Sequence, residues 1–171
     1  MRKMLLTLFV LLCTTTVFAN DFVTLFIEKY AEDRRPLNNV NIGKAMLEKM
    51  AASTNDEDLK KTFRELNSIH IVSSDNKRDS KHYFAKAHEL IKAEFGDYEE
   101  VVSVNEKASK ISVLMKRNDE ETQNLILISL NEEDKLTIIT VSGKIDFNSF
   151  SKLSGSIKNE QLIPEVVNHL Y

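Results

Sequence analysis

The second half of the chain alternates between short apolar runs and short polar turns. Four runs have the length of a β-strand: Tyr98–Val104, Lys110–Arg117, Gln123–Leu130 and Lys135–Ser142. Each turn between them opens with an asparagine, and the three are thirteen residues apart: Asn105, Asn118 and Asn131. Asparagine tolerates left-handed backbone angles and hydrogen-bonds its own backbone, which suits a turn. Residues 98–142 are therefore predicted to form a four-strand antiparallel meander.

One run of this meander differs from the others in having no polar face. Leu125–Leu130 reads Leu-Ile-Leu-Ile-Ser-Leu and carries no charge. A strand that is apolar on both faces belongs in the middle of a sheet whose two faces are at least partly covered. The sequence therefore predicts a central position for this strand.

The first half of the chain shows helical and strand periodicities in turn. Helices are predicted from Phe22, after Gly43, from about Glu57 and over Asp79–Phe95, with strands at Val40–Ile42 and Ser68–Ser74. Asp21 is expected to cap the first helix. Together the elements predict an α+β fold: a mostly antiparallel sheet of five or six strands that ends in the meander, with helices packed mainly on one face.

The first nineteen residues have the layout of a secretory signal. Arg2 and Lys3 precede the apolar run Met4–Leu12, and Val17-Phe18-Ala19 offers small residues where a signal peptidase cuts. We therefore expect cleavage between Ala19 and Asn20. The expected organisation is a signal over residues 1–19, one α+β domain over 20–154, and a C-terminal tail over 155–171.

The single cysteine of the chain lies inside this signal. Val10-Leu11-Leu12-Cys13 loosely resembles a lipoprotein cleavage box, so Cys13 is a candidate acceptor of a lipid anchor. Leu12 is large where such boxes have a small residue, which favours the alternative that Cys13 is a small apolar residue of the signal. In either case residues 20–171 contain no thiol, which excludes disulfides and cysteine catalysis from the domain.

The charge pattern limits the classes of partner. Without Arg2 and Lys3 the 23 basic residues become 21 against 26 acidic ones, a net charge of −5. The two signs are interspersed, whereas a nucleic-acid surface needs concentrated basic charge. No segment after the signal has the roughly 20 apolar residues of a membrane-spanning helix. An envelope protein partner is therefore expected, with no nucleic acid and no transmembrane span.

Motifs that would specify a cofactor or a reaction are missing from the sequence. The four glycines are too far apart for a phosphate-binding loop, and there is no Gly-x-Ser-x-Gly or His-Glu-x-x-His. His88 falls on the apolar side of the long predicted helix, where it is either a group that titrates near neutral pH or an edge residue of the core. No cofactor, metal or catalytic residue is predicted.

Paired carboxylates are the remaining candidates for chemistry. They form three clusters: Glu99-Glu100, Asp119-Glu120-Glu121 and Glu132-Glu133-Asp134. Acid–base catalysis needs carboxylates in an apolar cleft, whereas two of these clusters fall in predicted turns and the third alternates across a strand. Solvated surface charge is therefore the favoured interpretation.

Three segments carry a family resemblance. They are Val40–Leu47, Ser68–Ser74 with the long helix after it, and the end of the meander, Ile138–Asp146. Behind a signal peptide, this arrangement over about Asp21–Leu153 resembles the Gram-negative envelope family known as domain of unknown function 4252. The resemblance implies an exported α+β domain, often lipid-anchored, of unassigned function. It brings no catalytic residues, and the poor box around Cys13 departs from the anchored relatives.

Two functions remain open from the sequence. The first is an exported, non-enzymatic protein-interaction or structural module of the periplasm or envelope, which the export signal and the strongly patterned sheet favour. The alternative is a carrier of a small ligand or lipid in an apolar cavity between sheet and helices, which would need about 300 Å³ or more.

Overall fold

A computed structural model describes residues 21–145 apart from residues 33, 107–108 and 118–122. The described elements follow in the order α2 (Phe22–Tyr30), β1 (Asn38–Gly43), α3 (Lys44–Ser53), α4 (Glu57–Glu65), β2 (Leu66–Ser74), α5 (Lys77–Glu94), β3 (Glu99–Asn105), β4 (Lys110–Arg117), β5 (Gln123–Leu130) and β6 (Leu136–Gly143). The predicted α+β class is confirmed, and the strands of the meander begin and end within a residue of their predicted bounds.

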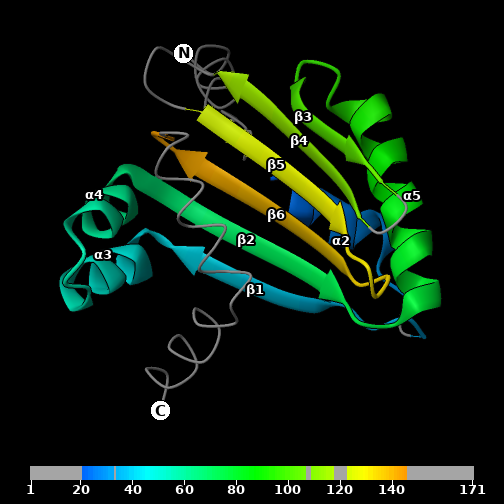
Figure 1. The fold of residues 1–171 in the computed structure, drawn as a ribbon, viewed down its shortest axis with the longest axis horizontal. Coiled ribbons are helices and arrows are strands. Elements are labelled where there is room, and N and C mark those ends of the chain that lie inside the picture. Colours follow the sequence, from blue (N-terminus) through cyan, green and yellow to red (C-terminus); the bar gives the residue numbers. More distant parts are fainter. Residues whose placement is uncertain (1–20, 33, 107–108, 118–122, 146–171) are drawn as a thin grey trace, which may run out of the picture.

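All six strands form one antiparallel sheet in the order β1-β2-β6-β5-β4-β3. The meander supplies four neighbouring strands, and β2 pairs with its last strand, β6 (Figure 1). This order leaves β1 and β3 at the two edges. It places β5 inside the sheet as predicted, with Leu125 fully buried on one face and Ile128 fully buried on the other.

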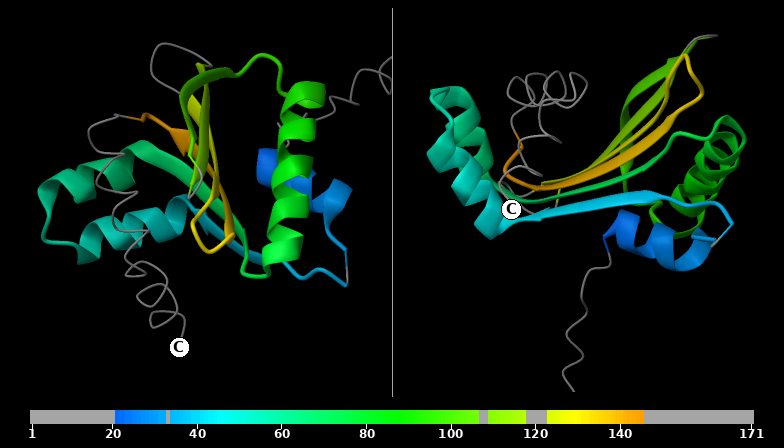
Figure 2. Two further views of the ribbon diagram at one scale, coloured as in Figure 1. Left: turned by 45° about the vertical axis from the view of Figure 1, so that its right-hand side comes forward. Right: turned by 90° about the horizontal axis from the view of Figure 1, so that it is seen from below.

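The four described helices divide between the two faces of the sheet (Figure 2). We call the face that packs against α2 and α5 the α5 face, and the other the α3 face. The larger pair, α2 and α5, forms the expected helical layer. Its residues Phe26, Tyr83 and Leu90 are fully buried in the core between this layer and the sheet. The α3–α4 pair packs instead at one end of the α3 face, through Leu47, Ala51 and Phe63.

The ends of the helices follow from local chemistry. Asn76 caps α5 and Asp56 caps α4, each accepting two backbone N–H groups of the first turn. The sequence pattern predicted that the long helix begins at Asp79, whereas α5 begins two residues earlier, at Lys77. The prediction was late because Asn76 had not been identified as the cap. Glycine after a helix is typical of a left-handed angle. Gly96 follows α5 but does not adopt that angle, and the helix ends at Phe95 with φ −123°.

Gly143 is the glycine whose conformation the fold requires. Its φ is +139°, a region that side chains rarely adopt. A Cβ there would lie 2.6 Å from both the Glu65 carbonyl oxygen and the Leu66 Cα. The next residue, Lys144, donates its backbone N–H to the same Glu65 oxygen at 3.0 Å. Gly143 therefore lets the end of β6 lie directly against the junction of α4 and β2.

Candidate functional site

The strand register places a row of polar side chains across one end of the α5 face. Ser68 of β2 is paired with Ser142 of β6, Ser142 with Asn124 of β5, and Asn124 with Lys116 of β4. The next row on the same face begins with His70 and Thr140 and becomes apolar at Ile126 and Leu114. The α5 face therefore carries a polar end beside an apolar centre.

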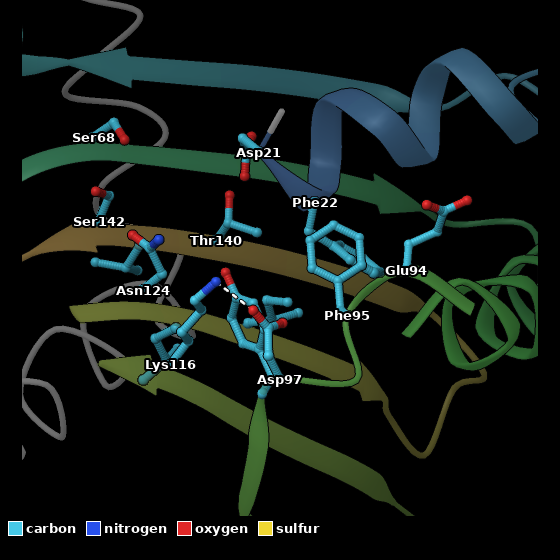
Figure 3. A pocket seen from close by; sticks show the side chains of 14 residues that line it. Asp21, Phe22, Ser68, Glu94, Phe95, Asp97, Lys116, Asn124, Thr140 and Ser142 are labelled. Atoms are coloured by element: carbon cyan, nitrogen blue, oxygen red, sulfur yellow. Dashed lines mark hydrogen bonds and ion pairs between the residues drawn. The ribbon is translucent and has the colours of Figure 1, made fainter. Parts of the chain in front are cut away.

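A pocket of about 430 Å³ lies over this polar row. Its walls come from the start of α2, through Asp21 and Phe22, and from the turn after α5, through Phe95, Asp97 and Tyr98 (Figure 3). The aromatic walls are held by ring contacts, because Phe95 lies edge-on to Phe22 at 5.0 Å and to Tyr98 at 5.5 Å. The pocket is thus polar at its floor and aromatic on one side.

A buried histidine lies beneath this pocket and ties three segments together. His70 Nδ1 is 2.6 Å from the Asp21 carboxylate, and His70 Nε2 is 2.8 Å from the Asn39 side-chain oxygen. Asp21 also accepts a hydrogen bond from Thr140, the residue paired with His70 on β6 (Figure 3). Asp21 occupies the predicted N-cap position of α2, but its side chain makes no standard capping hydrogen bond. The backbone N–H of Val23 is the smallest of the groups that lower the pKa of this carboxyl, after His70 and Thr140.

The electrostatics of the pocket favour an ionised Asp21. Burial alone would raise the pKa of this carboxyl, but the hydrogen bonds from His70 and Thr140 and the attraction of His70 outweigh it. The pKa of Asp21 therefore lies below its ordinary value. Across the pocket, Lys116 pairs with Asp97 and lowers the pKa of that carboxyl, while burial raises the pKa of the Tyr98 hydroxyl.

The hydrogen bonds of His70 link three segments of the fold: the start of α2, β1 and β2. Both ring nitrogens of His70 face oxygen atoms, so an imidazolium can donate to both at once. A neutral ring that donates to Asp21 would need the Asn39 amide turned to present its NH₂ group. In either state His70 has no free nitrogen to take a proton from the hydroxyl of Ser68 or Ser142.

The residues singled out from the sequence lie elsewhere. Ala19, Asn20 and Cys13 fall outside the described residues, as do Asp119-Glu120-Glu121 and the tail 155–171. Glu132 and Glu133 are exposed in the β5–β6 turn. Glu99 is exposed, and Glu100 accepts a hydrogen bond from Ser112. Among the described residues of these clusters, Glu99, Glu100, Glu132 and Glu133 do not line the pocket.

His88 occupies the half-buried position expected on α5. Its ring lies edge-on to Phe84 at 4.6 Å. Burial lowers the pKa of His88, with the charges of Lys92 and Lys110 adding to this and Glu100 opposing it. Of the two interpretations of His88 that the sequence allowed, this half-buried position supports an edge residue of the core.

Sequence reasoning missed the residues that form this site, His70 above all. The only local signal was a histidine flanked by Ile69 and Ile71 in a strand, which places a polar ring on the face opposite those two side chains. Its partner Asp21 lies 49 residues away, and no periodicity links the two. The described residues contain no group of three or more His, Cys, Asp or Glu that could hold a metal ion.

These features define an antiparallel α+β domain with a polar pocket at one end of its sheet. Residues 30–153, nearly three quarters of the chain, match the family described as "Domain of unknown function (DUF4252)". The chain belongs to this family, as the resemblance in its sequence implied. Asp21 and Phe22 lie before the matched residues, whereas the rest of the pocket lies within them.

Searches of curated proteins and of solved structures found no match. Among the described residues, none of the helices combines the length and hydropathy that a membrane crossing requires.

Proposed function

We propose that this protein is an exported, non-enzymatic module of the Gram-negative periplasm or envelope that binds a partner protein along the β3 edge of its sheet. The observation that carries the proposal is the exposure of Val101 and Val102, which have 39% and 43% of their surface accessible. Among the described residues, these two adjacent valines are the large hydrophobic side chains that are exposed to solvent.

The edge position of β3 gives this exposure its significance. β3 pairs with β4 on one side, and no described strand pairs with it on the other. An edge strand presents free backbone N–H and C=O groups, to which a partner can add a strand of its own. A β-bulge between Glu100 and Val102 interrupts the regular register here, which restricts any added strand to a short length.

The charges beside Val101 and Val102 define the chemistry of the expected partner. Glu99 and Glu100 precede the two valines, Glu106 follows the strand, and all three glutamates are exposed. An extended partner segment with an apolar centre and basic flanking residues would complement this edge. Exposed ion pairs between these glutamates and basic partner residues would contribute more to selectivity than to affinity. Val101 and Val102 would therefore supply most of the binding free energy.

Two further features support the non-enzymatic and exported parts of the proposal. Both ring nitrogens of His70 are engaged by Asp21 and Asn39, so this ring has no free nitrogen with which to act as a general base. The basic start, apolar run and Ala19–Asn20 junction have the layout of a cleaved signal. Cys13 as a lipid anchor remains the less favoured form of export because Leu12 precedes it.

The test compares two single substitutions on the two edges of the sheet. Val102→Lys and Asn38→Lys each add one charge to an exposed position on an edge strand. After chemical cross-linking in native envelopes, we expect one stoichiometric complex in the parent and in Asn38→Lys, and at least a tenfold loss of it in Val102→Lys. Equal amounts of complex in the two variants, both with the melting temperature of the parent, would contradict the proposal.

The second candidate function is a small-ligand carrier, and the pocket of about 430 Å³ favours it. Its floor of Ser68, Ser142 and Asn124 suits a small polar ligand better than the lipid that the sequence also left open. Native mass spectrometry of the protein released from envelopes tests this function. A retained small molecule that is lost on Asn124→Leu substitution would favour the carrier, and a bare mass would count against it.

A further inference from the structure

The side chains of the pocket divide into a polar group and an aromatic group. Ser68, Ser142 and Asn124 lie at one end, and the rings of Phe22 and Phe95 lie at the other (Figure 3). The volume of about 430 Å³ falls within the roughly 300–1,000 Å³ of small-molecule sites. The pocket thus offers hydrogen bonds at one end and apolar contact at the other to a molecule of modest size.

The three polar side chains form a row with regular spacing. Ser68 is paired with Ser142, and Ser142 with Asn124, so the row crosses three neighbouring strands that are about 4.8 Å apart. All three side chains are half-buried and line the pocket. A serine hydroxyl and an asparagine amide can each donate and accept hydrogen bonds. The row therefore suits a ligand whose own groups do both, at intervals of about one strand spacing.

The charged side chains that line the pocket already have partners within the protein. They are held in three pairs: Asp21 with His70 at 2.6 Å, Glu94 with Lys29 at 3.0 Å, and Asp97 with Lys116. A charged ligand would have to displace one of these partners, so the ion pair that it forms would be offset by the one that it breaks. The internal pairing therefore favours an uncharged ligand.

The aromatic wall adds a requirement for apolar contact. Phe95 is fixed between two other rings, edge-on to Phe22 and to Tyr98. The Lys116 ammonium lies 6.0 Å from the centre of the Tyr98 ring, so it covers part of that ring. The remaining ring surface can pack against C–H groups. A sugar ring carries hydroxyls around its rim and C–H groups on its faces, so it can meet the polar row and the aromatic wall together.

We infer that the pocket binds an uncharged, hydroxyl-rich ligand of the size of a mono- or disaccharide. Hydroxyls two carbons apart on a sugar ring are separated by about 5 Å, which is close to the spacing of the row. The Asp21 carboxylate lines the same pocket and supplies a strong acceptor for a further ligand hydroxyl. The inference rests on the carrier function, which is the second candidate above, and not on partner binding at the β3 edge.

Sugars that differ in charge test the class of ligand. Isothermal titration calorimetry on the protein purified from envelopes compares glucose, N-acetylglucosamine and maltose, which are neutral, with glucosamine and glucuronate. At about pH 6 the amine of glucosamine is protonated and glucuronate is ionised. We expect at least one neutral sugar to bind with a Kd below about 1 mM, and both charged sugars to bind at least tenfold more weakly than that sugar.

The contrary results separate this inference from the carrier function. Tighter binding of glucosamine or glucuronate than of every neutral sugar would overturn the inference and leave a carrier of a charged ligand. No binding of any of the five sugars at about 10 mM would overturn the inference and count against the carrier as well.

A matched pair of double substitutions tests the location. Ser68→Ala with Ser142→Ala removes two hydroxyls of the row, whereas Ser73→Ala with Ser129→Ala removes two half-buried hydroxyls on the α3 face of the sheet. The first pair should weaken binding of the tightest sugar at least tenfold, because two hydrogen bonds are lost, and the second should leave it unchanged. Equal losses would place the sugar outside the pocket and overturn the inference.

Amide signals in NMR spectra of the unsubstituted protein locate the sugar directly. The signals of Ser68, Asn124 and Ser142 should shift as the sugar is added, and those of Val101 and Val102 should not. Val102→Lys should leave the affinity for the sugar unchanged, so binding at the β3 edge and binding in the pocket can fail separately. Shifts confined to the β3 edge would overturn the inference.

Discussion

Replacement of Asp21 by Asn is the sharpest test of the network beneath the pocket. The substitution keeps the shape of the side chain but removes the charge that faces His70 Nδ1 at 2.6 Å. The His70 side chain is only 9% exposed, so water cannot replace the lost carboxylate. The amide that replaces the Asp21 carboxylate can still form a hydrogen bond to the ring, but without the charge that strengthens the present one.

The size of the effect follows from burial. A hydrogen bond to a charged group contributes about 1.5–3 kcal/mol. Because the Asp21 side chain is 34% exposed, solvent screens the pair, and we expect a loss near the lower end, about 1.5 kcal/mol. At about 2–4 °C per kcal/mol for a chain of this size, the melting temperature should fall by about 3–6 °C.

The dependence on pH has a definite sign. The folded-state pKa of Asp21 lies below its ordinary value of 3.8, so its contribution is fully present above that value. It is lost as the pH falls through the folded-state pKa. The gap in stability between the parent and Asp21→Asn should therefore be widest near neutral pH and close in strong acid.

Thermal unfolding followed by circular dichroism at neutral pH and at about pH 2.5, below the unfolded-state pKa, measures both effects. Asp75→Asn is the control, because Asp75 is an exposed carboxylate just after β2. The reasoning is refuted if Asp21→Asn and Asp75→Asn melt together at neutral pH, or if the gap widens in acid.

Three further predictions concern the core, the end of β6 and a titration. Ile128→Asp places a carboxylate at a fully buried position of a central strand and should cost about 4 kcal/mol or more, a large part of the stability of a typical domain; a melting temperature within a degree or two of the parent would contradict it. Gly143→Ala should cost about 2 kcal/mol or more because of its φ of +139° and the 2.6 Å contacts of a Cβ, whereas Gly43→Ala, with nothing within 4 Å, should be nearly neutral in the same denaturant titration. The ring protons of His88 should titrate in NMR spectra with a midpoint below the ordinary 6.5, since burial disfavours the charged ring, and a midpoint above 6.5 would show that it is not desolvated.

The strands could be predicted from the sequence because their signal is local. Leu125–Leu130 is apolar at every position but one, and the chain places it inside the sheet. The asparagine turns separate the strands of the meander, so that consecutive strands pair as neighbours. These features depend on residues that are close in the sequence, and periodicity reports them directly.

The division of the helices between two faces is not a local property. An apolar stripe shows that a helix has a buried side, but not which face of the sheet receives it. For the α3–α4 pair, part of the placement depends on Gly143. Because Gly143 has no Cβ, the end of β6 can lie directly against the end of α4.

The pocket could not be predicted because it depends on register and on distant contacts. Ser68, Ser142 and Asn124 come from three strands, and they form a row only in the register that the sheet adopts. Asp21 was read as a helix cap, since its position before an apolar stripe is typical of one. Its contact with His70 arises from the packing of α2 on the sheet, which no single segment specifies.

The most direct test of the proposed function is site-specific photo-cross-linking in living cells. A photoreactive residue at Val102 on the β3 edge is compared with one at Asn38 on the β1 edge, both at exposed positions. The proposal predicts one dominant protein adduct from position 102, absent from position 38 and abolished when Val101→Lys is added. Adducts of equal yield from both edges, or none from position 102, would show that the β3 edge is not the binding surface.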